Sequence, residues 1–223
     1  MVRKLSLDNM RRVLLASQSE RRFSWLKENL GEDIEFYSSA LISPESKPPQ
    51  GFEVSEQVER VCQSKAENAI IEHKLSEYQR KAHYDAILVA DTMIEDPDDH
   101  KSSFGKPIDG LSAAGMLIRL AGRKHKVWSS TSILLPPDSN ERGGDNAKWN
   151  ISNYTSFATV EFSDLGADEI FELISSESWK GKAGGYDLAG LAGKFCRVVE
   201  GEEVTVLGLS DLAIDRLVQI IPR

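Results

Sequence analysis

The sequence predicts an α/β protein with a mixed sheet, on the strength of two patterns. Short, unbroken apolar runs, typical of strands buried on both faces, are separated by stretches with helical periodicity. Other segments alternate apolar and polar residues, as antiparallel strands with one solvated face do. With 223 residues, the chain is long enough to bury a substantial core in one large α/β domain or two small lobes.

The first half of the chain begins with a charged extension, predicted to cover residues 1–12, and a single two-lobed domain is expected over 13–223. A proline-rich loop is expected near residues 43–51. In chain order, the predicted strands of this half cover 13–16, 34–37 and 86–90, and the predicted helices cover 23–30 and 53–78.

The second half continues the mixture of helices and strands. Residues 136–150 are polar and glycine-rich without periodicity, so we expect a long exposed hairpin loop there, a flexible insertion in the domain. Residues 181–193 are expected to be a loop at least in part. The predicted strands of this half cover 126–135, 155–162 and 195–199, and the predicted helices cover 111–121, 167–174 and 211–221.

Composition and charge exclude several classes of function. The formal net charge is −8, and because proteins that bind long nucleic acids usually present a basic face, a nucleic acid polymer is not expected as a partner. A mononucleotide needs only a local positive pocket. No apolar run approaches the ~20 residues that span a bilayer, so no membrane is expected. Cys62 and Cys196 form no C-x-x-C pair, which argues against a disulfide framework and favours a reducing, cytoplasmic location.

The loop between the first predicted strand and the first predicted helix concentrates groups that bind anions. Ser17 and Ser19 are candidate N-cap residues, and Arg21 and Arg22 fall in the first helical turn. Arginine is unfavourable there because it faces the positive end of the helix dipole. An anion bound at this terminus would remove the conflict and would receive backbone N–H, hydroxyl and guanidinium groups together. The alternative is a solvated helix start that carries its arginines by chance.

Lys65 lies on the apolar face of the long predicted helix. It follows Val61 by four residues and Val58 by seven, so the three side chains share one face. A lysine that points inward needs an anionic partner. The alternative is a lysine whose stem passes along the core and whose ammonium group reaches water.

Asp91 and Thr92 directly follow the most strand-like stretch, residues 86–90. Open α/β sheets place ligands at the C-terminal ends of strands, so Asp91 is a candidate for holding a divalent cation or for accepting a proton from water. On this pattern alone, a helix cap or a surface turn explains the residues equally well. Lys106 is expected in a tight loop about one short hairpin later, where Pro107 keeps it extended, although a plain turn explains this segment better.

The segment 182–186 reads Lys-Ala-Gly-Gly-Tyr. Its small residues permit close approach of the backbone to a ligand, and the Tyr186 ring could pack against a base or a ribose. The pattern is neither a Walker loop nor a dinucleotide fingerprint, and a flexible turn is the alternative. Asp96, Asp98 and Asp99 lack the spacing of a calcium loop and are expected to form a solvated turn.

The order of these segments resembles that of the Maf family, from about Val13 to Leu217. The resemblance therefore covers nearly the whole chain. In chain order, the segments that carry it are Ser17-x-Ser19-x-Arg21-Arg22, Glu45, Lys65-Ala66, Ala90-Asp91-Thr92, Gly105-Lys106-Pro107, Gly122-x-x-His125-x-Val127, Thr159-Val160-x-Phe162, Glu177, Lys182-Ala183-Gly184-Gly185-Tyr186 and Val206-Leu207-Gly208-Leu209.

The resemblance implies an elongated α/β fold, with a mixed sheet, flanking helices and a cleft between two lobes, similar to that of inosine triphosphatases. It implies a house-cleaning pyrophosphatase that hydrolyses a nucleoside triphosphate to the monophosphate and pyrophosphate. The cofactor would be a divalent metal, Mg²⁺ or Mn²⁺, and the protein would be a homodimer.

The resemblance also assigns roles to individual residues. Glu45 and Asp91 would hold the metal and the attacking water, with Asp91 as the proton acceptor. Thr92 matches the branch that prefers dTTP and UTP, and Lys182 and Tyr186 are implied substrate contacts. The side chains implied to bind or neutralise the phosphates are Ser17, Ser19, Arg21, Arg22, Lys65 and Lys106.

This inventory suits the chemistry. Water must attack the α-phosphorus while pyrophosphate leaves, so negative charge grows on the bridging oxygen. A metal and cationic side chains stabilise that charge, and a carboxylate orients or deprotonates the water. A plain α/β scaffold would leave Lys65 and the two arginines unexplained.

Two positions depart from the family pattern. Glu20 replaces a proline before the arginine pair, which adds a negative charge beside the phosphate loop. Ala189 replaces a glutamine in the late loop, which puts the dTTP and UTP preference in doubt more than the reaction. Two other functions stay open: a pyrophosphatase for a modified nucleotide such as methylated GTP, and a nucleotide-binding regulator of cell division without turnover.

Overall fold

The computed structural model describes residues 11–32, 34–78, 83–137 and 148–221. In this part of the chain, seven strands form one mixed sheet in the order β2-β1-β3-β5-β6-β7, with β4 paired to β3, which confirms the predicted fold class. The strands are β1 (Arg11–Leu15), β2 (Ile34–Ser38), β3 (Ala86–Asp96), β4 (Asp99–Phe104), β5 (Lys124–Leu135), β6 (Asn150–Phe162) and β7 (Cys196–Glu200).

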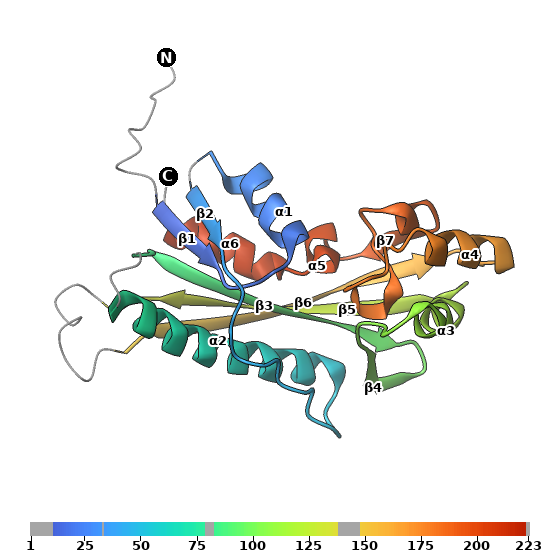
Figure 1. Cartoon of the computed structure of the whole chain (residues 1–223), viewed down its shortest axis with the longest axis horizontal. Helices are drawn as coiled ribbons and strands as arrows, with labels where there is room; N and C mark the ends of the chain where they lie inside the picture. The colour runs from blue at the N-terminus through green and yellow to red at the C-terminus, as the bar shows by residue number, and fades with distance from the viewer. Residues whose placement is uncertain (1–10, 33, 79–82, 138–147, 222–223) are drawn as a thin grey trace, which may run out of the picture.

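Helices cover both faces of this sheet (Figure 1). The long helix α2 packs along β3 and β5 on one face, and α1 and α6 lie on the other face near β1 and β2. At the opposite end of the long strands, α3 packs against α4. The helices are α1 (Glu20–Leu30), α2 (Val54–Tyr78), α3 (Gly110–Leu120), α4 (Ala167–Ser175), α5 (Glu203–Leu207) and α6 (Asp211–Ile220), with short 3₁₀ turns η2 (Ala183–Gly185) and η3 (Leu191–Lys194).

The central strand β3 changes its partners along its length. It pairs in parallel with β1 only as far as Leu88, opposite Leu15, and in antiparallel register with β5 as far as Ile94. Asp91 and Thr92 therefore lie inside β3, just beyond the end of β1. The prediction that the strand ends before Asp91 is wrong because β5 continues the ladder, and the alternatives of a helix cap or a surface turn are wrong for the same reason.

Most other predicted elements occur within a few residues of their expected bounds, but two elements were not predicted. These are β4, whose sequence is almost entirely polar, and the five-residue helix α5. Strand β1 already begins at Arg11, inside the expected extension, and residues 1–10 of that extension lie outside the described residues. Residues 138–147, within the expected flexible insertion, lie outside the described residues. The strands on either side of them, β5 and β6, form the predicted hairpin.

The acidic turn between β3 and β4 is not simply solvated, which corrects the expectation for Asp96. Asp96 is 8% exposed, and its carboxylate accepts hydrogen bonds from Arg119 Nε at 3.0 Å and Nη2 at 2.9 Å. Asp98 pairs with Arg119 and Arg123. Arg119 lies on α3 and Arg123 just after it, so these ion pairs fix the β3–β4 hairpin against the helix. The spacing of the sequence did not predict these contacts.

Within the described ranges, no helix is both long enough and apolar enough to cross a membrane. Cys62 and Cys196 are both buried as free thiols.

Candidate functional site

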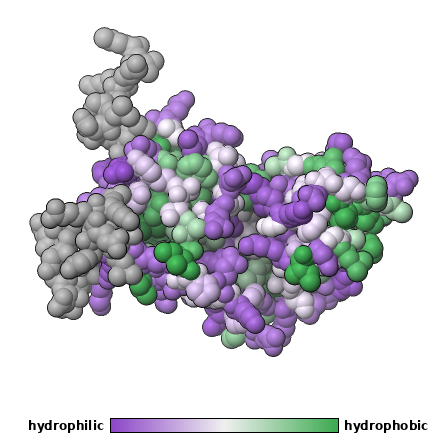
Figure 2. All heavy atoms as spheres, viewed as in Figure 1, coloured by the Kyte–Doolittle hydropathy of each residue, from purple (hydrophilic) through white to green (hydrophobic). Residues whose placement is uncertain are grey.

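A pocket of about 600 Å³ lies beside the point where β1 ends and β3 continues. In Figure 2, hydrophilic residues dominate the middle of the face shown. The structure brings all of the predicted site residues to the wall of this pocket. They are Ser17, Ser19, Arg21, Arg22, Glu45, Lys65, Asp91, Thr92, Lys106, Lys182 and Tyr186.

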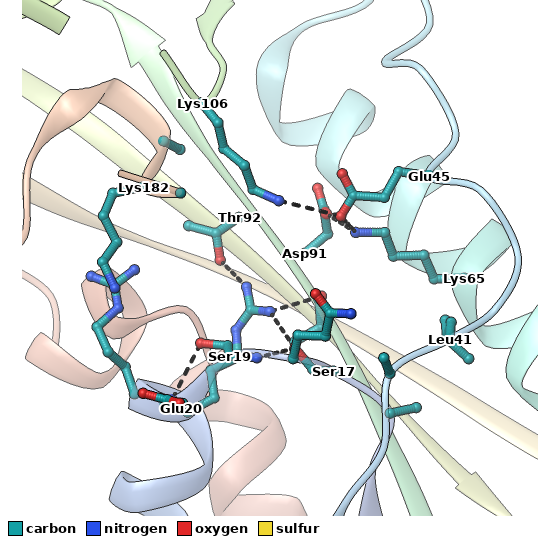
Figure 3. A pocket seen from close by; sticks show the side chains of 18 of the residues that line it. Ser17, Ser19, Glu20, Leu41, Glu45, Lys65, Asp91, Thr92, Lys106 and Lys182 are labelled. Carbon is teal, nitrogen blue, oxygen red and sulfur yellow. Dashed lines mark hydrogen bonds and ion pairs between the residues drawn. The ribbon is translucent and has the colours of Figure 1, made fainter. Parts of the chain in front are cut away.

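Two lysines and two carboxylates converge in this pocket (Figure 3). Lys65, from α2, places its Nζ 2.7 Å from Asp91 Oδ1 and 3.2 Å from Glu45 Oε1. Lys106, from the loop after β4, places its Nζ 3.5 Å from the same Glu45 oxygen. Lys65 and Asp91 each have only 14% of their side chain exposed. Lys65 is therefore an inward-pointing lysine with anionic partners, and the alternative of an ammonium group in open water is excluded.

The charges of this cluster stabilise one another. Burial alone would lower the pKa of Lys65, but the carboxylates of Asp91 and Glu45 outweigh that effect and raise it. The Lys65 ammonium in turn lowers the pKa of Glu45, against a smaller opposing effect of burial and with further help from Lys106. Glu45 is therefore a carboxylate and Lys65 an ammonium group at neutral pH.

The loop that carries Glu45 is attached to α2. The carboxylate of Glu72 accepts hydrogen bonds from the backbone N–H of Ile42, at 3.0 and 3.1 Å, and of Ser43, at 2.9 Å. On the other side of Glu45, the hydroxyls of Ser46 and Ser64 are 2.8 Å apart. These contacts fix the loop on the helix that also supplies Lys65.

Arg22 is enclosed by neutral acceptors of the protein. It donates to the carbonyl oxygens of Gly208 at 2.7 Å and Ala90 at 3.2 Å, to Thr92 Oγ1 at 2.9 Å, and to Ser17 Oγ at 3.3 Å. Burial lowers the pKa of Arg22, and the Asp91 carboxylate partly opposes this shift. A solvated helix start is therefore excluded for Arg22, whose guanidinium supplies positive charge while it binds the loops around the pocket together.

The predicted connection between β1 and α1 is present, with Ser19 as the N-cap residue. Ser19 Oγ accepts from the backbone N–H of Arg22 at 3.4 Å, and Ser17 Oγ accepts from that of Ser19 at 3.1 Å. Arg21 meets a carboxylate of the chain itself, since its Nη1 lies 2.9 Å from Asp187 Oδ1. Glu20 also lines the pocket, so its negative charge borders the site.

Tyr186 and Thr92 are held in the pocket wall by contacts with buried residues. Tyr186 is only 4% exposed, and its hydroxyl lies 2.9 Å from Nε2 of the buried His125. Its ring packs edge-on against Phe162, so little of the ring is left for stacking on a base or ribose. Thr92 Oγ1 lies 2.9 Å from Ser129 Oγ, which donates to the carbonyl oxygen of Thr205 at 2.7 Å.

The carboxylates of Glu45 and Asp91 are the candidate metal ligands of this pocket. Both contact the Lys65 ammonium group and therefore face the same point in the pocket. In the part of the chain that the structure describes, no three His, Cys, Asp or Glu side chains form a metal-binding group. Mg²⁺ is commonly held by one or two carboxylates together with phosphate oxygens and waters. The donor set thus fits a hard cation that shares its coordination with a phosphate ligand.

Four residues of this site carry no prediction of their own from the sequence: Glu72, Ser129, Asp187 and Gly208. Asp187 follows the predicted 182–186 segment directly, but its partner Arg21 is 166 positions away, and no local pattern reveals such a pair. Gly208 appears only as part of a matched family segment. Glu72 and Ser129 lie inside predicted elements, where a polar residue is usually solvated.

Comparison with known proteins shows the family of the chain. Residues 12–220 match the Maf-like protein family. The chain belongs to the Maf-like family. One similar relative, a dTTP/UTP pyrophosphatase of Wolbachia pipientis subsp. Culex pipiens (strain wPip), is 31% identical over 211 residues, which cover 92% of this chain and 90% of the relative.

Two further relatives carry the same name, dTTP/UTP pyrophosphatase. That of Clostridium novyi (strain NT) is 31% identical over 89% of this chain and 91% of its own. That of Pyrococcus furiosus (strain ATCC 43587 / DSM 3638 / JCM 8422 / Vc1) is 27% identical over 95% of this chain and 96% of its own. These three relatives therefore align with the chain over nearly their full lengths.

Proposed function

We propose that the protein hydrolyses the bond between the α- and β-phosphates of a nucleoside triphosphate, releasing the monophosphate and pyrophosphate. The observation that carries the proposal is the convergence of Glu45, Asp91, Lys65 and Lys106 in one pocket, beside the start of α1. The names of the relatives support it, since those proteins are dTTP/UTP pyrophosphatases. Turnover distinguishes the proposal from a nucleotide-binding regulator.

In the proposed reaction, Asp91 orients a water molecule toward the α-phosphorus and accepts its proton. Lys65 and Lys106 stabilise the charge that grows on the bridging oxygen as pyrophosphate leaves. Ser17, Ser19 and the first turn of α1 bind phosphate oxygens through hydroxyl and backbone N–H groups.

A divalent cation, Mg²⁺ or Mn²⁺, is part of the proposal, with Glu45 and Asp91 as its ligands in the protein. When bound, it supplies Lewis-acid stabilisation of the phosphates and lowers the pKa of water. Because Lys65 contacts both carboxylates, a cation held by them would share their oxygens with its ammonium group.

We propose dTTP and UTP as the substrates. The names of the relatives and the presence of Thr92 support this choice. The Thr92 hydroxyl is held between Arg22 and Ser129, so it has a fixed orientation at the pocket wall. Because Ala189 replaces the family's glutamine, modified purine nucleotides should be tested in parallel. Turnover of purine triphosphates alone would contradict the pyrimidine assignment.

We also propose that the protein is a cytoplasmic homodimer. The dimer is supported by exposed apolar side chains on and beside α3, at Ile108, Leu111 and Ile118. Apolar residues gather at the end of the molecule where α3 and α4 lie (Figure 2). Analytical ultracentrifugation measures the oligomeric state, and a purely monomeric protein at micromolar concentration would contradict the dimer.

Replacing Asp91 by asparagine tests the catalytic assignment. Asp91→Asn keeps the size of the side chain but removes its basic oxygen, so pyrophosphate release should fall by about 100-fold or more while triphosphate binding persists. Steady-state kinetics with Mg²⁺ and calorimetry with a non-hydrolysable triphosphate measure the two quantities. The matched control is Asp215→Asn, on the exposed face of α6, which should keep full activity. Unchanged turnover of Asp91→Asn would remove Asp91 from the mechanism.

A further inference from the structure

The basic residues around the pocket already have partners within the protein. Lys65 and Lys106 contact the carboxylates described above, and Lys180 Nζ lies 2.7 Å from Glu177. Arg21 and Lys182 share one carboxylate, that of Asp187. Its Oδ1 lies 2.9 Å from Arg21 Nη1, and its Oδ2 lies 3.5 Å from Lys182 Nζ.

Asp187 lies behind these two cations. Arg21 and Lys182 line the pocket, whereas Asp187 itself does not, and its side chain is only 15% exposed. Arg21 and Lys182 retain about a quarter of their side-chain surface, at 26% and 24%. Both cations therefore face the pocket while one carboxylate, itself partly shielded from water, offsets their charge.

This arrangement resolves the conflict found in the sequence, where Arg21 faces the positive end of α1. The anion that such an arginine requires is supplied by the chain, from a loop on the other side of the pocket. A phosphate group that reaches Arg21 and Lys182 must then share them with, or take them from, the Asp187 carboxylate. The attraction between a phosphate group and these two cations is therefore weaker than it would be if the cations had no carboxylate partner.

We propose that Asp187 is an internal counter-anion that competes with phosphate groups for Arg21 and Lys182 and so keeps the pocket from retaining its pyrophosphate product. The proposal rests on the proposed function and deepens it. Contacts that bind substrate and product equally lower KM without raising kcat, and they slow product release. Weakening such contacts is therefore useful in an enzyme whose product is itself a strong anion.

The test is calorimetric titration of inorganic pyrophosphate into the full-length protein and its Asp187→Asn variant, at fixed pH and ionic strength. Asparagine matches aspartate in size but removes the charge. We expect the variant to bind pyrophosphate roughly tenfold more tightly, the scale of removing one partly screened unit charge close to the anion. Kinetically, KM for the triphosphate and the inhibition constant of pyrophosphate should fall by similar factors, while kcat should not rise.

The control is Glu172→Gln, which removes one charge from an exposed carboxylate paired with Lys194 outside the pocket. It should leave pyrophosphate affinity unchanged. Asp187→Ala provides a second variant, which lacks any hydrogen bond to Arg21. Unchanged or weaker pyrophosphate binding in both Asp187 variants would overturn the proposal and make Asp187 a residue that positions the two cations. The titration needs no turnover, so failure of the proposed reaction would show separately, as wild-type protein that releases no pyrophosphate from any triphosphate.

Discussion

Gly208 shapes the wall of the pocket through a contact that only glycine allows. Its φ of 112° lies in the left-handed region, and its carbonyl oxygen accepts a hydrogen bond from Arg22 Nε. A Cβ at this position would lie 2.6 Å from that Nε and 2.9 Å from Nη2. Any larger residue must displace the guanidinium that holds Ser17 and Thr92.

Gly208→Ala should therefore lower kcat/KM by roughly tenfold or more, because Arg22 loses its place, and should cost about 1–2 kcal/mol through the unfavourable backbone. Steady-state kinetics well below the melting temperature separate the two effects. Gly115→Ala is the matched control, since a Cβ there meets nothing within 4 Å on helix α3. If Gly208→Ala kept wild-type kcat/KM, Arg22 would not organise the site.

At the residue scale, the sequence predicted a site residue where its side chain is unfavourable for the local structure. Lys65 interrupts an apolar helix face, and Arg21 opposes a helix dipole, so each needed an anion that the structure supplies. Asp187 and Ser129 are not unfavourable in their local structure. Their importance comes from partners far along the chain, which a single sequence does not reveal.

At the scale of elements, α2 organises one side of the site. It supplies Lys65, and its Glu72 and Ser64 attach the loop that carries Glu45. Releasing this loop should weaken the proposed metal site without unfolding the helix.

Glu72→Ala removes the acceptor for the backbone of Ile42 and Ser43, so Glu45 should lose its fixed position. We expect kcat/KM to fall about tenfold at limiting Mg²⁺ and to recover partly at high Mg²⁺, because a loose ligand costs metal affinity of this order. A titration of activity against Mg²⁺ measures the effect, with Glu67→Ala, exposed on the same helix, as the control. A wild-type Mg²⁺ dependence in Glu72→Ala would contradict this account of the loop.

The elements themselves were predictable where their periodicity is strong, as in α2 and the apolar start of β3. The failures have physical reasons. The second half of β3 continues because β5 and, at its end, β4 pair with it, and β4 is polar because it lies at an edge with exposed side chains. Such strands are specified by their partners rather than by local pattern, so the position of Asp91 inside a strand could not be predicted.

At the scale of the whole molecule, the core that contacts Tyr186 contains a buried histidine, His125. Burial lowers the pKa of His125 from 6.5 to about 4. The unfolded chain therefore takes up a proton first as the pH falls, and the folded state loses stability between pH 6.5 and pH 4.

From these two values, the free energy of unfolding should fall by about 2 kcal/mol between pH 7 and pH 5 because of this residue alone. In His125→Gln, which keeps a polar partner for Tyr186, that part of the pH dependence should disappear. Urea unfolding of both proteins at pH 7 and pH 5 provides the comparison. Equal losses in the two proteins would show that His125 is not the group responsible.

In the proposed reaction, water attacks the α-phosphorus of the nucleoside triphosphate. The most direct measurement is hydrolysis of dTTP and UTP by the wild-type protein in ¹⁸O-labelled water with Mg²⁺, followed by mass spectrometry of the products. Attack at the α-phosphorus should place one ¹⁸O atom in the nucleoside monophosphate and none in the pyrophosphate. Label in the pyrophosphate, release of orthophosphate with a nucleoside diphosphate, or no hydrolysis of any triphosphate would contradict it.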